Sequence, residues 1–169
     1  MRRSRSFLAF AGFAAGTIAA AWVGSRYNPS KGGTKIWYNA LRKPAYNPPR
    51  AVFPIVWPIL YTLMAWSAYR VWRREPSAER TRALVLWTAQ LGTNAAWSKL
   101  FFGQRRPDLA LVDLDVMRAL IAAYMKSAYQ VDRMAAAVFL PYFAWVTFAR
   151  KLNKEIVRRN LPEGRLLAA

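Results

Sequence analysis

The sequence predicts an all-α fold, a bundle of five transmembrane helices. Long apolar segments alternate with short charged breaks, and no stretch shows the alternation of polar and apolar residues that is typical of strands. The 169 residues are 55% hydrophobic and include 8 Trp, yet the formal net charge is +18 and the mean hydropathy is only +0.03. A membrane protein carries this much Lys and Arg when the charges gather in loops and at helix ends.

The first apolar segment, residues 7–24, has no charged side chain and reaches the lower length limit for a transmembrane helix. Gly12, Gly16, Ala20 and Gly24 recur at every fourth position, and such a row of small residues lets a second helix approach closely. A cleavable signal peptide is the alternative, because basic residues precede the segment and small residues end it. The regular spacing favours a retained helix.

Four further helices are predicted, and short charged turns connect them. They lie at about 51–72, 81–102, 109–129 and 134–152, after a loop at 25–50 and before a polar tail at 153–169. Short connections make consecutive helices antiparallel neighbours, so we expect residues 1–169 to form a single five-helix domain. Five spans place the termini on opposite sides, and Lys and Arg favour the first loop and the tail on the cytosolic side.

The composition excludes several classes of chemistry. The chain has no Cys and no His, which excludes disulfides, thiol nucleophiles and histidine ligation of metal or haem. With only eight Asp and Glu, neither a carboxylate metal cage nor a paired-carboxylate hydrolase is predicted. We therefore expect no metal site, no required cofactor and no dedicated enzyme. A basic nucleic-acid-binding module is the least favoured reading, because the charges are scattered between apolar runs, and no nucleic-acid partner is expected.

Aromatic and amide side chains form stripes on three of the predicted helices. The stripes are Phe53, Trp57, Tyr61 and Met64; Trp87, Gln90, Leu91, Asn94 and Trp97; and Tyr142, Trp145, Ala149 and Leu152. Because an unsatisfied amide facing lipid costs several kcal/mol, Gln90 and Asn94 should point inward. Such stripes either pack a core or line a site for a flat apolar ligand, and the periodicity alone leaves both readings open.

Four segments resemble the translocator protein family, also called the tryptophan-rich sensory protein or peripheral-type benzodiazepine receptor (TspO/MBR) family. They are "WYNALRKPAYNPPR", "FPIVWPILYTLMAWSAY", "AQLGTNAAWSKLFFG" and "LPYFAWVTFARKLN". The resemblance covers about residues 24–160. It implies five transmembrane helices, a long first loop that covers an internal pocket, frequent homodimers, and binding of protoporphyrin IX, with sterols and benzodiazepine-site drugs as further ligands.

Together with the stripes, the resemblance implies a ligand site. Its residues are Phe53, Pro54, Val56, Trp57, Tyr61, Gln90, Asn94, Trp97, Val116, Tyr142, Trp145, Ala149 and Leu152, and the covering loop contributes Trp37, Tyr46, Pro48 and Pro49. Trp57 and Trp145 match tryptophans that are implicated in light-dependent porphyrin breakdown in bacterial members. Consecutive prolines lower the conformational entropy that the loop loses when it folds over the pocket. They also cannot continue a helix, so the second helix is delayed until about Arg50. The basic residues of the loop either attract ligand carboxylates or simply flank the membrane.

The leading hypothesis is a membrane-embedded binding protein or translocator for tetrapyrroles such as protoporphyrin IX. The alternative is a light-dependent porphyrin-degrading enzyme. The expected location is the bilayer of a bacterial inner membrane, or the mitochondrial outer membrane of a eukaryote. The sequence does not fix the oligomeric state, and the homodimer is implied by the resemblance alone.

Charges on the fourth predicted helix depart from the family pattern. Asp115, Arg118 and Lys126 share one face and Asp113 lies opposite. This charged face either forms a dimer interface, reaches the bilayer edge, or marks a variant altered for solubility. Near the end of the last helix, Lys154 or Glu155 replaces the sterol-linked Tyr of the family, so sterol recognition through that segment is doubtful.

Overall fold

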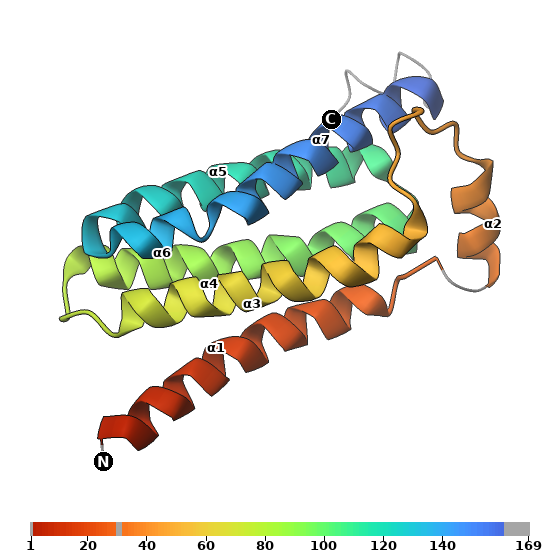
Figure 1. Cartoon of the computed structure of the whole chain (residues 1–169). Helices are drawn as coiled ribbons and strands as arrows, with labels where there is room; N and C mark the ends of the chain where they lie inside the picture. The colour runs from red at the N-terminus through yellow and green to blue at the C-terminus, as the bar shows by residue number, and fades with distance from the viewer. Residues whose placement is uncertain (1, 30–31, 161–169) are drawn as a thin grey trace.

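The computed structural model describes residues 2–29 and 32–160, and every regular element in this part of the chain is helical. The long helices are α1 (Arg2–Ser25), α3 (Phe53–Trp72), α4 (Ala78–Ser98), α5 (Pro107–Val131) and α7 (Leu140–Asn160), which together form an elongated bundle (Figure 1). The shorter elements are α2 (Gly32–Ala40), the 3-10 turn η1 (Arg50–Val52), the π-helical turn η2 (Lys99–Gly103) and α6 (Arg133–Ala137). The all-α prediction is confirmed. The predicted count of five helices is not, because α2 and α6 are additional.

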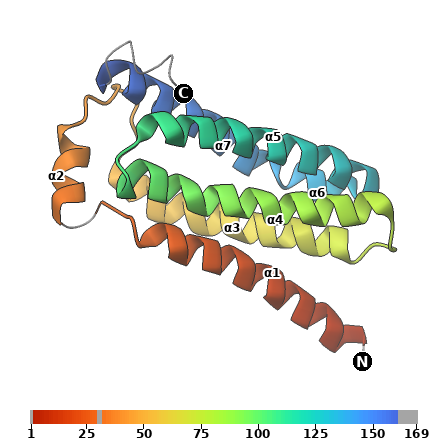
Figure 2. The same ribbon diagram turned by 180° about the vertical axis from the view of Figure 1, so that it is seen from behind.

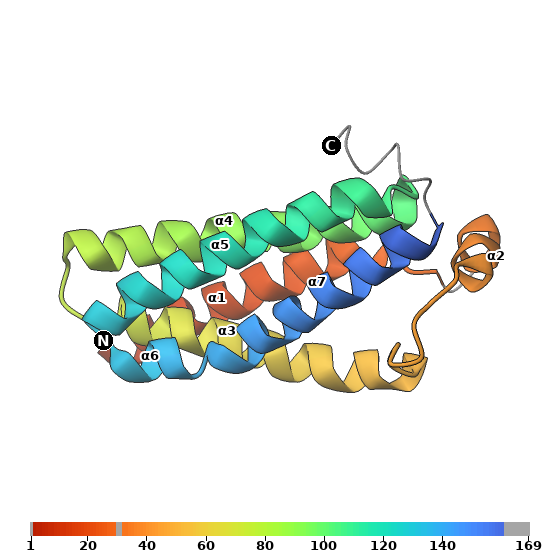
Figure 3. The ribbon, with the colours of Figure 1, turned by 90° about the horizontal axis from the view of Figure 1, so that it is seen from above.

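The bundle has two ends with different character. α1 begins at one end, whereas α7 finishes at the other end beside α2 (Figures 1 and 2). α1 packs on α3 and α4, α4 packs on α5, and α5 packs on α7. Seen from above, α3 and α7 lie close together near α6 and diverge toward the α2 end (Figure 3). This divergence places the seam between α3 and α7 at the end where the first loop returns to the bundle.

Gly16 and Gly24 of α1 face α4 of the same chain, whereas a Cβ at Gly12 would have no neighbour within 4 Å. A Cβ atom at Gly16 would lie 3.4 Å from the Trp87 ring, and Ala20 is buried. Phe13 packs edge-on against Trp87 at 5.3 Å, and the Trp87 indole N–H donates to the carbonyl of Met64 at 3.0 Å. The row of small residues thus permits a close helix approach, as the retained-helix interpretation predicts.

Two of the helical segments are long and apolar enough to cross a membrane, namely Ser6–Ser25 and Arg50–Trp72. The other long helices carry polar residues that lower their hydropathy, such as Gln90 and Asn94 on α4 and Asp115 on α5. Large apolar side chains of α1 remain exposed on its outer face: Phe7, Leu8, Ile18 and Trp22. An exposed apolar face of this kind is what contact with lipid requires.

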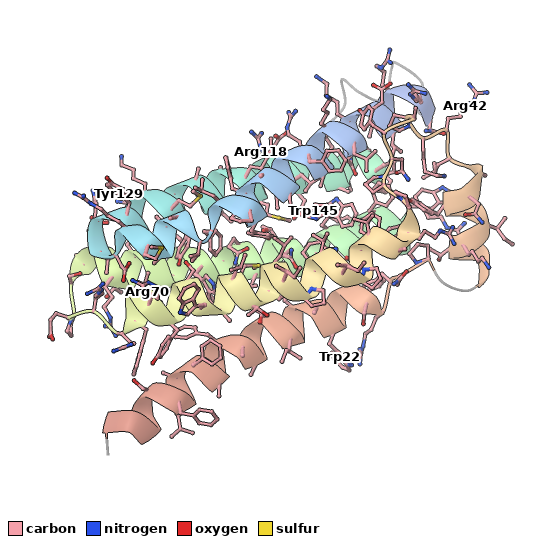
Figure 4. The ribbon with its side chains drawn as sticks, in the orientation of Figure 1. Trp22, Arg42, Arg70, Arg118, Tyr129 and Trp145 are labelled. Carbon is pink, nitrogen blue, oxygen red and sulfur yellow. The ribbon has the colours of Figure 1, made fainter. Side chains whose placement is uncertain are left out.

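The charged face of α5 is paired with α7. Asp115 accepts hydrogen bonds from the guanidinium of Arg150, and Arg118 approaches the same carboxylate to 3.6 Å. Arg118 lies on the outer surface of the bundle (Figure 4). The Asp115 carboxylate is therefore shared by its same-face neighbour Arg118 and by Arg150 of α7.

The last predicted helix, 134–152, differs from the structure at both ends. Pro141 cannot donate a backbone hydrogen bond and its ring clashes with the preceding turn, so the chain breaks into α6 and α7. α7 then continues to Asn160, beyond the predicted end at residue 152, because its polar stretch still packs against the bundle. The Asn153 amide donates to the carbonyl of Pro107 at 2.6 Å, and Ile156 is buried. The rest of the predicted tail, 161–169, lies outside the described residues.

Candidate functional site

An open groove lies between α3 and α7, with a volume of about 510 Å³. Its walls are apolar and consist of Pro48, Val56, Leu60, Pro141, Ala144, Trp145 and Phe148. Trp145 extends from α7 toward α3 (Figure 4). The groove opens to the outside of the bundle, so the predicted internal pocket covered by the loop is not confirmed.

Six predicted residues lie in or beside this groove. Pro48, Val56 and Trp145 form part of its wall, and the Trp57 ring meets Trp145 edge-on at 6.5 Å. Phe53 also packs edge-on against Trp145, at 5.9 Å, and Tyr61 stacks on Trp57 at 5.1 Å. These residues come together because α3 places Phe53, Trp57 and Tyr61 at intervals of four, which keeps them on one helix face.

The polar members of the predicted site form a hydrogen-bonded chain inside the bundle. The Tyr61 hydroxyl donates to Asn94 Oδ1 at 2.9 Å, and Asn94 Nδ2 donates to the Tyr142 hydroxyl at 3.0 Å. That hydroxyl in turn donates to the sulfur of Met117 at 3.4 Å. Gln90 is fully buried and donates to the carbonyl of Trp87 on its own helix. These groups tie α3, α4, α5 and α7 together, and both amides point inward as predicted.

A second aromatic cluster lies at the α2 end of the bundle and includes three predicted site residues. Trp97 stacks on Phe101 at 5.0 Å, Trp37 of α2 meets Phe101 edge-on at 5.8 Å, and Leu152 packs against the same cluster. The π-helical turn η2 positions Phe101, with the Gln104 N–H donating to the carbonyl of Lys99 at 2.8 Å. Trp37, Trp97 and Leu152 are thus placed in this cluster, whereas none of the three lines the groove.

The first loop is fastened to α7 and reaches the groove at one point. The backbone N–H of Arg42 donates to Asn160 Oδ1 at 2.8 Å, and Asn160 Nδ2 donates back to the Arg42 carbonyl at 2.9 Å. Lys43 donates to the carbonyl of Leu41 at 3.0 Å, and burial together with nearby Arg50 lowers the pKa of Lys43. Pro48 lines the groove, and η1 begins at Arg50, as the paired prolines predict.

Several predicted residues lie away from the groove wall. Val116 is 47% exposed, because the inward position on this turn of α5 belongs to buried Met117. Pro49 and Pro54 are also exposed, and Ala149 packs against the main core. Conversely, sequence reasoning missed four wall residues: Leu60, Pro141, Ala144 and Phe148. Pro141, Trp145 and Phe148 share a helical spacing, so a stripe neighbouring the chosen one would have identified them.

Within residues 2–29 and 32–160, no group of three or more His, Cys, Asp or Glu side chains is placed to hold a metal ion. The groove itself contributes no titratable side chain. The groove therefore offers a concave shape and an aromatic surface, which suit the binding of an apolar molecule.

Comparison with known proteins places the chain in a family. Residues 13–159 match the TspO/MBR family. The tryptophan-rich sensory protein of Cereibacter sphaeroides is 40% identical over 158 residues, covering 92% of this chain and 95% of the relative. The translocator protein of Homo sapiens is 38% identical over 152 residues, covering 88% of each chain. Protein CrtK of Rhodobacter capsulatus is 34% identical over 125 residues, covering 73% of this chain and 78% of the relative. The chain therefore belongs to the TspO/MBR family.

Proposed function

We propose that this protein is a membrane-embedded binding protein or translocator whose ligand is a flat tetrapyrrole such as protoporphyrin IX. Family membership and relatives named translocator protein support a membrane translocator or binding role. The single observation that carries the ligand class is the apolar groove with Trp145 in its wall and Trp57 edge-on behind it.

The groove suits a flat apolar molecule in size and in chemistry. Its volume of about 510 Å³ lies within the range of about 300–1,000 Å³ for small-molecule sites. Trp145 and Phe148 from α7 face Val56 and Leu60 from α3 across it. Aromatic walls favour stacked or edge-on contact with a conjugated ring system. The groove opens between two helices of a membrane bundle, so an apolar ligand enters it from the hydrocarbon layer.

Fluorescence titration tests the proposal. We expect protoporphyrin IX to quench the tryptophan emission of the protein in nanodiscs in a saturable manner. Trp145→Phe replaces the indole by a smaller ring, and the lost contact area is worth about 1 kcal/mol, so the Kd should rise about fivefold. Trp22→Phe is the matched control, because Trp22 lies on the outer face of α1 and is 57% exposed. Quenching that does not saturate, or equal effects of both substitutions, would refute the groove as the site.

A second candidate function is light-dependent breakdown of the bound porphyrin. The observation that favours it is the pair Trp57 and Trp145, whose rings lie 6.5 Å apart beside the groove and supply two oxidisable side chains. Under illumination in air, porphyrin absorbance should then fall faster with the protein than without it, and Trp145→Phe should slow the loss. Equal rates with and without protein would discard this function.

Benzodiazepine-site drugs are also flat and apolar, so we expect them to displace the porphyrin from the same groove. A sterol site near the end of α7 is not proposed, because Glu155 is held there in ion pairs with Arg158 and Arg159, each at 2.7 Å. The homodimer stays a prediction. Gly16 of α1 packs against α4 of the same chain, so it cannot contribute to a dimer interface.

A further inference from the structure

A lysine sits at the edge of the groove, one aromatic ring away from its wall. The ammonium of Lys151 lies 5.3 Å from the centre of the Tyr46 ring. The Tyr46 ring in turn packs edge-on at 6.3 Å from Phe148, which lines the groove. Tyr46 comes from the first loop and Lys151 from α7, so this cation–π contact joins the loop to the mouth of the groove.

Lys151 forms no ion pair with any carboxylate in the described part of the chain. Glu155, the one carboxylate of α7, lies a turn further on and is bound by Arg158 and Arg159. Asp115, the α5 carboxylate that reaches α7, is bound by Arg118 and Arg150. Lys151 is exposed and lies on the α2 side of the groove wall, so its positive charge has no counterion among the described residues.

We propose that Lys151 binds the carboxylate of the ligand, so that the groove selects flat apolar molecules that carry an acid group. The apolar body lies against Pro48, Trp145 and Phe148, and the carboxylate meets the Lys151 ammonium at the exposed edge. This arrangement keeps the ring system out of water while the charged group stays partly hydrated, which avoids the cost of burying a charge. The inference rests on the proposed tetrapyrrole-binding function and names the group that the site recognises.

The experiment compares protoporphyrin IX, which has two carboxylates, with its neutral dimethyl ester. Both are titrated into the protein in phosphatidylcholine nanodiscs, whose lack of net charge removes attraction by the membrane surface. The variants are Lys151→Met, Lys151→Arg and Lys126→Met. Lys126 is the matched control, because it is exposed on α5 and likewise forms no ion pair with a described residue.

For Lys151→Met we expect the Kd of the diacid to rise about tenfold, the size of a partly exposed charge-assisted hydrogen bond, while the Kd of the ester stays unchanged. Lys151→Arg should retain diacid binding because the charge remains, and Lys126→Met should match the parent for both porphyrins. Raising the salt concentration should weaken binding of the diacid to the parent and leave the ester unaffected.

The outcomes separate the inference from the proposed function. Unchanged diacid binding in Lys151→Met overturns the inference, and the function stands if the parent still binds. Equal weakening of diacid and ester overturns it as well, because the lysine would then act only through the shape of the groove. If neither porphyrin binds the parent in a saturable manner, the proposed function itself fails.

Discussion

Asp132 provides the sharpest test of how this bundle is held together at the end opposite the first loop. It is 6% exposed and lies between α5 and α6. It caps α6 by accepting the Ala135 N–H at 3.1 Å, and it pairs with Arg70 in the last turn of α3 at 3.0 Å and with Arg74 just after that helix at 2.7 Å. A single carboxylate thus joins three helices.

The structure gives the size of the effect. An N-cap contributes about 1 kcal/mol. The Arg70 pair, with that side chain 28% exposed, adds about 1.5 kcal/mol. The Arg74 pair is 53% exposed on the arginine side and adds about 0.5 kcal/mol. Because both arginines still reach water, removal of Asp132 leaves no buried charge. The expected loss of stability is therefore about 3 kcal/mol.

Thermal unfolding in detergent, followed by circular dichroism, measures this effect. Asp132→Ala should lower Tm by about 6–12 °C, since 1 kcal/mol corresponds to about 2–4 °C for a chain of this size. Asp132→Asn keeps a capping oxygen and loses the charge, so Tm should fall by about 4–8 °C. Glu75→Gln is the control, because Glu75 is an exposed carboxylate near the same end and forms no ion pair with a described residue. If Asp132→Asn melts like the parent, the two arginines contribute nothing and the reasoning fails.

The pH dependence follows from the same contacts. Burial alone would raise the pKa of Asp132, but hydrogen bonds from Arg74, the Ala135 N–H and Arg70 outweigh it and hold the pKa below its ordinary value. A carboxyl group with a lowered folded-state pKa stabilises the fold above its unfolded pKa of about 3.9, and this stability is lost as pH falls through the folded value. The Tm difference between the parent and Asp132→Asn should therefore be full at pH 7 and shrink below about pH 4.

Two further predictions concern stability and are read by the same melting experiment. Gly103→Ala should destabilise the protein by about 1–3 kcal/mol, because a Cβ there would lie 2.7 Å from the Tyr27 ring, whereas Gly92→Ala, with nothing within 4 Å, should stabilise it by about 0.5–1 kcal/mol. Equal effects of the two substitutions would contradict the packing of Tyr27 against η2. Tyr61→Phe should cost about 1–3 kcal/mol, because it removes the donor to Asn94 Oδ1 in a buried position. An unchanged Tm would show that this oxygen has another partner.

Much of the fold follows from local spacing along the chain. The apolar segments predict long helices, Pro48 and Pro49 predict the start of η1 at Arg50, and the small residues of α1 predict a close helix neighbour. These features depend on backbone chemistry and on the helical repeat, which act over a few residues. Pro141 nevertheless divides the last predicted helix into α6 and α7.

The candidate site depends more on how the helices cross. Asn94 was expected to point inward, but its partners Tyr61 and Tyr142 come from two other helices. Val116 was expected at the ligand and faces outward, because a shift of one residue rotates a side chain by about 100° around the helix axis.

The sequence by itself determined that this chain is helical, that its amides turn inward and that its aromatic residues fall on shared helix faces. Only the tertiary structure decided that Asp115 meets Arg150, that Lys151 rests over Tyr46, and that the groove opens outward between α3 and α7. The physical reason is that side-chain periodicity is a property of one helix, whereas the rotation and divergence of two helices depend on everything packed between them.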